Sequence, residues 1–355
     1  MADFLKQSFT LQKDIPLAPL TTLKIGGRAR FFVAVHDEVE VAEAFAFAEK
    51  ESLDIFILGA GSNVLISDTG FDGLVLQIAL QDKSYAFTRE ESVTPKGVML
   101  TVAAGEDWDG FVAYCVEHDL AGVECLSGIP GFVGGTPVQN VGAYGQEVSE
   151  TIHSVRCFDR KTKDFVALAN ADCGFAYRTS IFNSTERERY IVLSVTFSLH
   201  RGGDPKIIYK DLKEHFGEER PSLNDVRDAV LEIRRSKSMV IDADDPNSKS
   251  AGSFFKNPVV EKSKFEEIRA SYANAPSFQF GDKVKIPAAW LIESAGFCKG
   301  FILGNAGIST NHSLALINRG GASAEEILLL KKEIQDGVEA KFGIMLQPEP
   351  VFVGF

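Results

Sequence analysis

The sequence has no apolar stretch that approaches the ~18 residues needed to cross a bilayer as a helix, so no membrane partner is expected. Its first residues, MADFLKQSFTLQKD, lack the basic-then-apolar order of a secretory signal, and we expect a cytoplasmic protein. Cysteine is scarce: the five residues show no CxxC spacing and indicate reduced thiols. These cysteines and six scattered histidines form no ligand set, so no metal site is predicted.

Positive charge is also in deficit. The chain has 37 Lys and Arg against 49 Asp and Glu, a net charge of −12, which leaves no basic stripe to neutralise a nucleic-acid backbone. A few local groups are still enough to hold the phosphates of a nucleotide. The length of 355 residues, with 45% apolar and 24% charged residues, is typical of a soluble globular protein with two or three domains.

Apolar periodicity predicts mixed α and β structure. Asp37 with Glu40, and Ser323 with Glu326, are typical of capping boxes, and Gly343 is a C-terminal stop. Helical spacing occurs in the stretches 36–53, 107–122, 222–237 and 323–343, and strand patterns occur at 54–59, 73–78, 151–158, 189–199 and 346–355.

The stretch FILGAGSNVLISDTGFDG, residues 56–73, looks like the start of a dinucleotide site. A Rossmann turn requires GxGxxG and a helix directly after it, but here Val64 replaces the third glycine and helix-breaking residues follow. We therefore predict a strand, a glycine turn and another strand. The exposed amides from Gly59 to Asn63, with the Ser62 and Asn63 side chains, suit a phosphate held in a backbone nest.

A second glycine-rich segment, LSGIPGFVGGTPVQNVGAYGQ at 126–146, holds six glycines and is too rich in breakers for a helix. Glycine allows close backbone approach and positive φ. A long pyrophosphate-bearing cofactor explains two such loops better than two unrelated tight turns.

Five motifs in order then resemble one family. ILGAGSNVLI, GIPGFVGGTPVQNVGAYG, FAYRTSIF, AGSFFKNP and LQPEPVFVG are similar to the UDP-N-acetylenolpyruvoylglucosamine reductases, flavoenzymes of peptidoglycan precursor synthesis. The resemblance runs from about Pro16 to the C-terminus. It implies an α+β fold: an FAD-binding domain of the vanillyl-alcohol-oxidase (PCMH) type at 16–201, in two halves split near 75, and a substrate-binding domain at 202–355 that ends in a catalytic strand.

The resemblance implies that FAD lies between the two halves. Neither glycine-rich loop contains His or Cys, the residues that attach flavin covalently in some relatives of this fold, so we expect dissociable FAD. The residues implied to contact FAD are Gly59, Ala60, Gly61, Ser62, Asn63, Ile129, Pro130, Gly131, Gly135, Val138 and Gly142.

In this family NADPH reduces the flavin and leaves, and the enolpyruvyl ether of UDP-N-acetylglucosamine enters the same site. Flavin N5 gives hydride to C3, a proton is added at C2, and the product is UDP-N-acetylmuramate. Negative charge that develops on the enolate-like species requires a fixed cation, and Arg178 matches the family's carboxylate-binding arginine. Ser253 matches the general acid that protonates C2. Taken alone, these would be an ordinary arginine at a strand end and a polar strand residue.

Glu349 matches the family's C-terminal glutamate, which either stabilises the protonated intermediate or relays a proton near C2. Because an ionised carboxylate beside a developing anion is repulsive, we expect a raised pKa or a protonated Glu349 in the complex. Taken alone, a terminal glutamate between prolines would be a solvated charge.

The substrate contacts implied by the resemblance are Tyr144, Tyr209, Lys237, Asn257 and Lys285, and Tyr209 marks the variant whose substrate loop carries a tyrosine. Lys237 also suits the dipole at the end of a predicted helix. His312 either faces the site or is structural. Two departures stand out: Phe278 replaces a tyrosine found in some relatives, and Gly134 and Gly135 replace serines, so that backbone amides would have to bind phosphate there.

Two other functions fit parts of the pattern. A sugar or alcohol oxidase that reduces O2 would share the flavin fold, but it predicts neither the AGSFFKNP serine nor a diphosphate clamp. A non-enzymatic nucleotide-sugar binding protein would lack one of Arg178, Ser253 and Glu349, and all three are present. We expect the reductase, acting as a monomer or weak oligomer.

Overall fold

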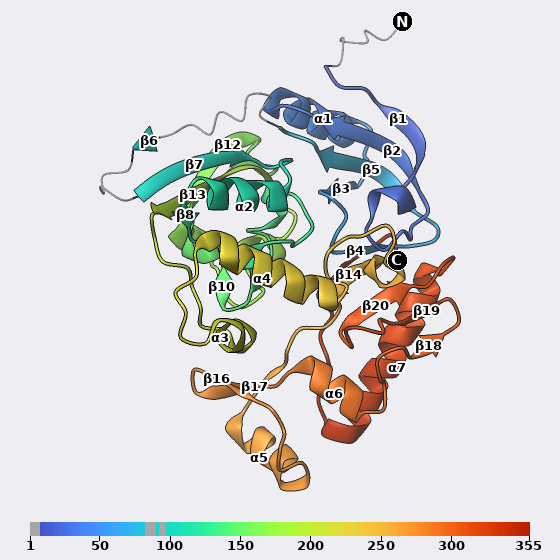
Figure 1. Cartoon of the computed structure of the whole chain (residues 1–355). Coiled ribbons are helices and arrows are strands. Elements are labelled where there is room, and N and C mark those ends of the chain that lie inside the picture. The colour runs from blue at the N-terminus through green and yellow to red at the C-terminus, as the bar shows by residue number, and fades with distance from the viewer. Residues whose placement is uncertain (1–7, 82–89, 92–96) are drawn as a thin grey trace, which may run out of the picture. The chain divides into compact units, whose positions relative to one another are not determined.

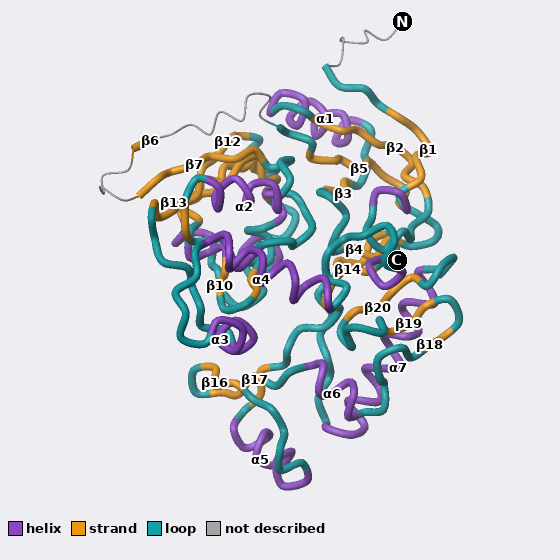
Figure 2. The backbone as a smooth tube through the Cα atoms, in the orientation of Figure 1, coloured by secondary structure: helices purple, strands orange, loops and turns teal. Residues whose placement is uncertain are grey.

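A computed structural model describes residues 8–81, 90–91 and 97–355 of the chain. It divides into two compact units, each assembled from separate parts of the sequence (Figure 1). The first unit comprises the segment ending at Ile15, Ala29–Ala60 and Asp72–Arg235. The second unit comprises Pro16–Arg28, Gly61–Phe71 and Ser236–Phe355. Both units mix helices and strands, as Figure 2 shows by colour.

Two sheets form most of the first unit. One has the strand order β1-β2-β5-β3, and the other has the order β12-β11-β13-β7-β6 with β8 paired to β13. The strands are β1 Gln12–Pro16, β2 Arg28–Val35, β3 Ile55–Leu58, β5 Phe71–Ile78, β6 Glu90–Glu91, β7 Gly97–Ala103, β8 Leu120–Ala121, β11 Ile152–Asp159, β12 Asp164–Ala169 and β13 Tyr190–Arg201. A short hairpin is formed by β9 Gly142–Ala143 and β10 Gln146–Glu147.

The α-helices that the structure describes beside these sheets are α1 Glu38–Lys50, α2 Trp108–Glu117, α3 Lys210–Phe216 and α4 Leu223–Ser236. Asp37 caps α1 by accepting from the amide of Glu40, as the sequence predicts. The fully buried Trp108 and the buried Phe111 of α2 pack against Phe197 of β13, which fixes the start of this helix on the second sheet.

The second unit contains a sheet of order β14-β20-β19-β18, a small sheet β15-β17-β16 and the parallel pair β21-β4. Its elements are β4 Val64–Ile66, β14 Ser250–Ser253, β15 Val259–Val260, α5 Lys262–Ser271, β16 Phe278–Phe280, β17 Lys283–Lys285, α6 Ala288–Ser294, β18 Ile302–Leu303, β19 Ala306–Ile308, β20 Ala315–Asn318, α7 Ala324–Phe342 and β21 Val351–Val353.

Helix α7 organises this second core by packing on β19 and β20. Its buried residues Ile327, Leu330, Ile334 and Val338 recur at the helical period. The predicted capping box is present, since Ser323 accepts from the amide of Glu326 and the Glu326 carboxylate accepts from that of Ser323. Gly343 ends the helix with φ +63°.

Among the described residues, no helix is both long and apolar enough to cross a membrane. The same residues contain no group of three or more His, Cys, Asp or Glu side chains placed to hold a metal ion.

Candidate active site

The glycine turn at 59–63 joins two strands, as predicted. β3 leads into it and β4 follows directly, so no helix begins after the glycines. Leu65 and Ile66 of β4 are buried, and β4 pairs in parallel with the C-terminal β21. An anion at this turn would have to be bound by the turn's own backbone and side chains, because no helix starts directly after the glycines.

The glycines of the two loops differ in their surroundings: one is tightly packed, and others have open space beside them. At Gly61, φ is +66° and an added Cβ would lie 2.0 Å from the carbonyl oxygen of Leu20, so glycine is required by packing. At Gly59, apart from its two chain neighbours, no described residue has an atom within 4 Å of such a Cβ, and Gly135 in the second loop is equally open. At these two positions the backbone is open enough for a ligand to approach it closely.

The start of α2 holds the second glycine-rich loop. The indole N–H of Trp108 donates to Leu126 O (3.1 Å), its backbone amide donates to Gly131 O (3.0 Å), and the Gly128 amide donates to the Asp109 carboxylate (2.6 Å). Arg227 of α4 makes two bonds to Asp109, at 2.6 and 2.9 Å. Burial opposes ionisation of Asp109, but the bonds from Arg227 and Gly128 outweigh it and lower the pKa of that carboxyl.

Two amides of this loop differ from expectation. Gly134 N donates to Ala104 O (2.9 Å) and Gly135 N donates to Phe132 O (3.0 Å). Both amides already have acceptors inside the protein, contrary to the expectation that they bind phosphate in place of serine side chains. At Gly134 an added Cβ would lie 2.5 Å from the Ala104 Cβ, so this glycine serves close packing.

The second unit brings three predicted site residues together. Ser253, the last residue of β14, is followed by Phe254, whose carbonyl accepts from the Glu349 amide (2.9 Å). One step further, Phe255 and Pro348 form an antiparallel bridge, and Lys256 N donates to Gln347 O. The side chain of Asn63 donates to Glu349 O (3.3 Å). Residues far apart in sequence thus converge on one short backbone pairing.

Arg178 lies in the first unit, in a turn closed by the bridge between Ala176 and Thr179. Its φ of 53° is in the left-handed region, which is costly for a residue with a side chain. The guanidinium donates to Gly142 O in the second glycine-rich loop, and the Asn183 side chain donates to Arg178 O (3.2 Å). A strained residue held from both ends is typical of a functional position.

Two predicted substrate tyrosines also meet in the first unit. The rings of Tyr144 and Tyr209 lie edge to face with centroids 5.4 Å apart. Arg234 of α4 hydrogen-bonds to the Tyr144 side chain. Burial raises the pKa of the Tyr144 phenol, and the charge of Arg234 partly offsets this. Arg234 is itself buried, which lowers its pKa.

The remaining residues predicted to contact the substrate lie on different elements of the fold. Lys237 follows the end of α4 directly, and Asn257 Oδ1 accepts from the Ala288 amide (2.8 Å) at the start of α6. Lys285 of β17 pairs with Phe278 in register, and its ammonium lies 5.5 Å from the centre of the Phe280 ring. The carbonyl of His312 accepts from the amide of Ala315, so the backbone of His312 closes the turn before β20.

Comparison with known proteins bears on this arrangement. Residues 244–353 match a family model described as UDP-N-acetylenolpyruvoylglucosamine reductase, C-terminal domain, and residues 29–163 match one described as FAD binding domain. The UDP-N-acetylenolpyruvoylglucosamine reductases of Thermobifida fusca and Streptomyces coelicolor are each 45% identical over 354 residues, covering 96% of this chain and 98% and 90% of theirs. The chain belongs to the UDP-N-acetylenolpyruvoylglucosamine reductase family.

Structural similarity agrees with this membership. The crystal structure of the Thermus caldophilus UDP-N-acetylenolpyruvylglucosamine reductase has the same fold, with a TM-score of 0.67 at 24% identity, and the match covers 97% of this chain and 99% of that one. The predicted resemblance and the α+β fold with a PCMH-type FAD-binding domain are confirmed. The chain is an FAD-dependent oxidoreductase of the reductase family.

The residues present fit the cofactor of a family reductase. Open space at Gly59 and Gly135 lets a flat or pyrophosphate-bearing group approach the backbone, and Ser62 and Asn63 adjoin the first of these positions. The second loop is fixed in place by the start of α2, so its wall is formed before a ligand arrives. Ile129 and Val138 are half-buried against the core of the first unit.

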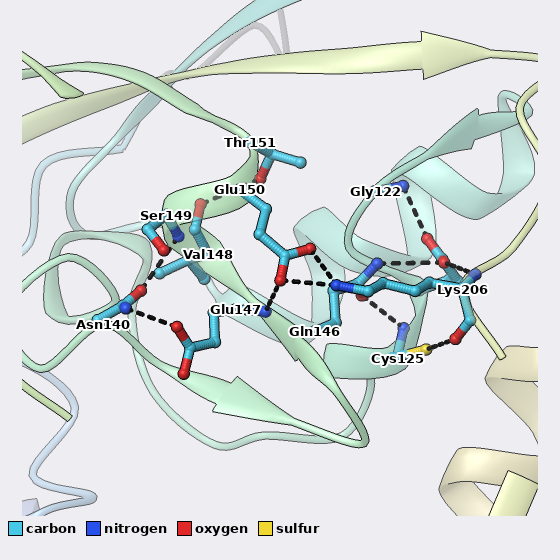
Figure 3. A network of polar contacts seen from close by, with 11 residues as sticks. Gly122, Cys125, Asn140, Gln146, Glu147, Val148, Ser149, Glu150, Thr151 and Lys206 are labelled. Carbon is cyan, nitrogen blue, oxygen red and sulfur yellow. Dashed lines mark hydrogen bonds and ion pairs between the residues drawn. The ribbon is translucent and has the colours of Figure 1, made fainter. Parts of the chain in front are cut away.

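Sequence reasoning missed Asn140, a buried residue of this reductase with φ 46°. Its side-chain amide donates to Glu147 (2.9 Å) and to Ala176 O (3.1 Å), and its Oδ1 accepts from the Ser149 amide (Figure 3). Asn140 therefore links the hairpin that carries Gly142 to the turn that carries Arg178. A polar residue inside an irregular loop gives no periodic signal, and only its proximity to glycines points to a left-handed backbone.

Arg234 was missed for a different reason. The apolar positions of the predicted helix at 222–237 include Val226 and Val230, and Arg234 continues that stripe. An arginine on an apolar helix face is a usable signal, because burying its charge requires a polar partner. The sequence does not say that the partner is Tyr144.

Proposed function

We propose that this chain is an NADPH-dependent UDP-N-acetylmuramate dehydrogenase. It reduces the enolpyruvyl ether of UDP-N-acetylglucosamine to UDP-N-acetylmuramate in peptidoglycan precursor synthesis. Relatives that are 45% identical over almost the whole chain carry the name of this reductase. The structural observation that carries the proposal is the pairing of Phe254 with Glu349 beside Asn63, because it gathers the proton donor, the glutamate and the cofactor turn.

Bound FAD would supply the redox chemistry by taking hydride from NADPH and delivering it from N5 to C3 of the enol ether. We propose that the Gly59–Asn63 turn and the loop from Ile129 to Gly142 hold it. The absence of His and Cys from both loops supports a dissociable cofactor. A cytoplasmic location and a monomeric or weakly oligomeric state stay predictions.

Arg178 binds the carboxylate of the substrate in this proposal. Hydride addition at C3 places negative charge on C2 and the carboxylate, and a guanidinium in a fixed place stabilises that charge without reorganising. The bond to Gly142 O and the left-handed turn support such fixation. A carboxylate accepts two parallel hydrogen bonds from a guanidinium, which a lysine in this position would not offer.

Ser253 donates the proton to C2, and the electron pair of the enolate forms the new C–H bond. A hydroxyl is a weak acid, so the developing alkoxide has to regain a proton from a neighbour. Glu349 is close in the fold and either stabilises the protonated intermediate or relays that proton. We expect its pKa to be raised in the substrate complex, because an ionised carboxylate would repel the developing anion.

The nucleotide part of the substrate would be held by Tyr144, Tyr209, Lys237, Asn257 and Lys285. The ring contact between Tyr144 and Tyr209 supports a shared role for these two residues. Lys237 and Lys285 would supply positive charge for the diphosphate.

The test separates the two half-reactions of the purified yellow protein under anaerobic conditions. NADPH should bleach the flavin, and the enolpyruvyl nucleotide should restore its colour. Ser253→Ala should leave the bleaching rate intact and slow reoxidation by about 10²–10⁴-fold, the usual contribution of a general acid. Ser250→Ala, a loss of the same hydroxyl on the same strand, is the matched control and should reoxidise normally.

Loss of the NADPH half-reaction in Ser253→Ala with normal reoxidation would show that Ser253 is not the proton donor. A preparation that contains no flavin even after reconstitution would remove the proposed function as a whole.

A further inference from the structure

Glu124 is a buried carboxylate that the proposed chemistry does not use. Its residue is 1% exposed, in the 3-10 turn Glu124–Leu126 that precedes the second glycine-rich loop. Burying a carboxylate is costly unless hydrogen bonds replace its hydration. A neutral residue at this position would avoid this cost. The contacts of Glu124 therefore indicate what its carboxylate contributes to the fold.

Three N–H donors surround this carboxylate. Oε2 accepts from the Gly122 amide (2.7 Å), and Oε1 accepts from the Lys206 amide (3.0 Å) and from the Gln146 side chain (3.1 Å). Gln146 in turn accepts from the Cys125 amide (2.9 Å). Figure 3 shows Gly122, Gln146 and Lys206 converging at this point. The ammonium of Lys206 bonds to Glu150 instead, at 2.7 Å, so backbone and amide N–H groups balance the charge of Glu124.

The groups that Glu124 holds lead to the two substrate tyrosines. Gln146 begins β10, directly after the hairpin turn that carries Tyr144, and Lys206 lies three residues before Tyr209. The two segments also touch, because a Cβ added at Gly145 would lie 2.5 Å from Ile208 Cγ1. The rings of Tyr144 and Tyr209 on these two segments also meet edge to face. Glu124 is thus the junction between the hairpin and the segment before α3.

We propose that Glu124 is a positioning residue for substrate binding: its carboxylate fixes the hairpin of Tyr144 against the segment of Tyr209. The inference rests on the proposed function, in which both tyrosines contact the nucleotide. A carboxylate is suited to this junction because it only accepts hydrogen bonds, and all three groups that face it are donors. It acts on the substrate through the tyrosines alone.

The test is Glu124→Gln in the FAD-loaded protein. The new NH2 group must face one of the N–H donors, so at least one bond is lost and the junction shifts. A hydrogen bond to a charged group contributes about 1.5–3 kcal/mol, so we expect the Kd of the enolpyruvyl nucleotide, titrated by flavin absorbance, to rise roughly 10- to 150-fold. The rate of bleaching at saturating NADPH should not change.

Asp159→Asn is the matched control. Asp159 is another buried carboxylate of the first unit, 2% exposed, and it accepts from Arg189 and from the Lys161 amide. It ends β11, at the opposite end from Ile152 and the Glu150 region. Asp159→Asn should leave the Kd of the enolpyruvyl nucleotide unchanged. A double-mutant cycle with Tyr209→Phe adds a readout that a general loss of stability would not produce, since coupled residues give non-additive effects.

The outcomes distinguish the proposed function from the positioning role of Glu124. If NADPH bleaches the flavin of the wild-type protein and the enolpyruvyl nucleotide reoxidises it, the proposed function stands. If Glu124→Gln then binds the nucleotide as tightly as wild type, if Asp159→Asn weakens binding equally, or if the cycle with Tyr209→Phe is additive, the positioning role is overturned. Should Glu124→Gln fail to fold, Gln146→Met removes one contact of the junction at similar volume and is expected to weaken nucleotide binding in the same direction.

Discussion

Among the ten non-glycine residues with positive φ that the structure describes, two are predicted site residues and a third, Asn140, lies between two others in the second glycine-rich loop. Asn140, Tyr144 and Arg178 have φ values of 46°, 48° and 53°, and only Asn tolerates this conformation readily. Each of them is fixed by a named bond: Asn140 to Glu147, Tyr144 to Arg234, and Arg178 to Gly142. Strain of this kind persists only where surrounding contacts over-determine it, which supports a functional role for this loop cluster.

Asp159 gives a prediction about pH. The hydrogen bonds from Arg189 hold the pKa of its carboxyl at about 2, below the ordinary value of 3.8. Because the folded pKa is below the unfolded one, the stabilisation is fully present above about pH 4 and is lost as the pH falls toward about 2. The free energy of unfolding of wild type, measured with urea across this range, should fall with the pH.

Asp159→Asn tests the assignment. This variant should be less stable than wild type at neutral pH, and the difference between the two should shrink as the pH falls from about 4 to about 2. A constant difference across the same range would mean that the Asp159–Arg189 ion pair does not cause this part of the acid sensitivity.

At the scale of elements, the glycine turn between β3 and β4 has a packing role at Gly61 and a proposed binding role at Gly59. A Cβ added at Gly61 would lie 2.0 Å from the carbonyl oxygen of Leu20, whereas a Cβ added at Gly59 would meet open space. Gly61→Ala should therefore destabilise the fold, with a lower Tm in the absence of FAD. Gly59→Ala should keep the Tm of the apoprotein but weaken FAD binding, because the methyl group would occupy space that the proposed site leaves to FAD.

The two measurements are a thermal melt of apoprotein and a titration with FAD followed by flavin fluorescence. If Gly59→Ala binds FAD as wild type does, the turn is not a cofactor wall. A stable Gly61→Ala apoprotein would instead show that the loop around Leu20 yields to the added methyl group.

The long helices were accessible from the sequence, whereas several strands, among them β2, β7 and β12, were not predicted. The helices at 38–50, 108–117, 223–236 and 324–342 have amphipathic spacing and caps, which are local signals. β4 and β21 have three residues each and form only by pairing with one another. Strands of this length have no intrinsic stability, so their existence depends on tertiary contacts.

At the scale of the whole molecule, the second unit depends on two segments from the N-terminal part of the chain. Leu23, Ile25 and Leu65 are buried in its core, and β4 pairs with β21. The predicted domain boundary after residue 201 stays a prediction. The first compact unit ends at Arg235, and the chain continues in the second unit from Ser236. A C-terminal domain cut at either point would lack these residues.

We therefore expect the isolated fragment 236–355 not to fold cooperatively. Its exposed core should bind a hydrophobic dye, and its thermal unfolding by circular dichroism should show no sharp transition. Fragment 202–355 lacks the same three residues and should behave alike. A cooperative transition in either fragment would show that Leu23, Ile25 and Leu65 are dispensable for the second core.

Sequence alone determined the mixed α and β structure and the absence of a helix after Gly61, because these depend on local spacing and residue type. The family followed from the resemblance of five motifs in order, and the candidate catalytic residues are what that resemblance implies. Tertiary structure decided which of them meet. The pairing of Phe254 with Glu349 beside Asn63, the strained turn of Arg178 against Gly142 and the junction at Glu124 join residues separated by up to 286 positions. Such contacts arise from packing and from the need to satisfy buried polar groups, and no periodicity along the chain encodes them.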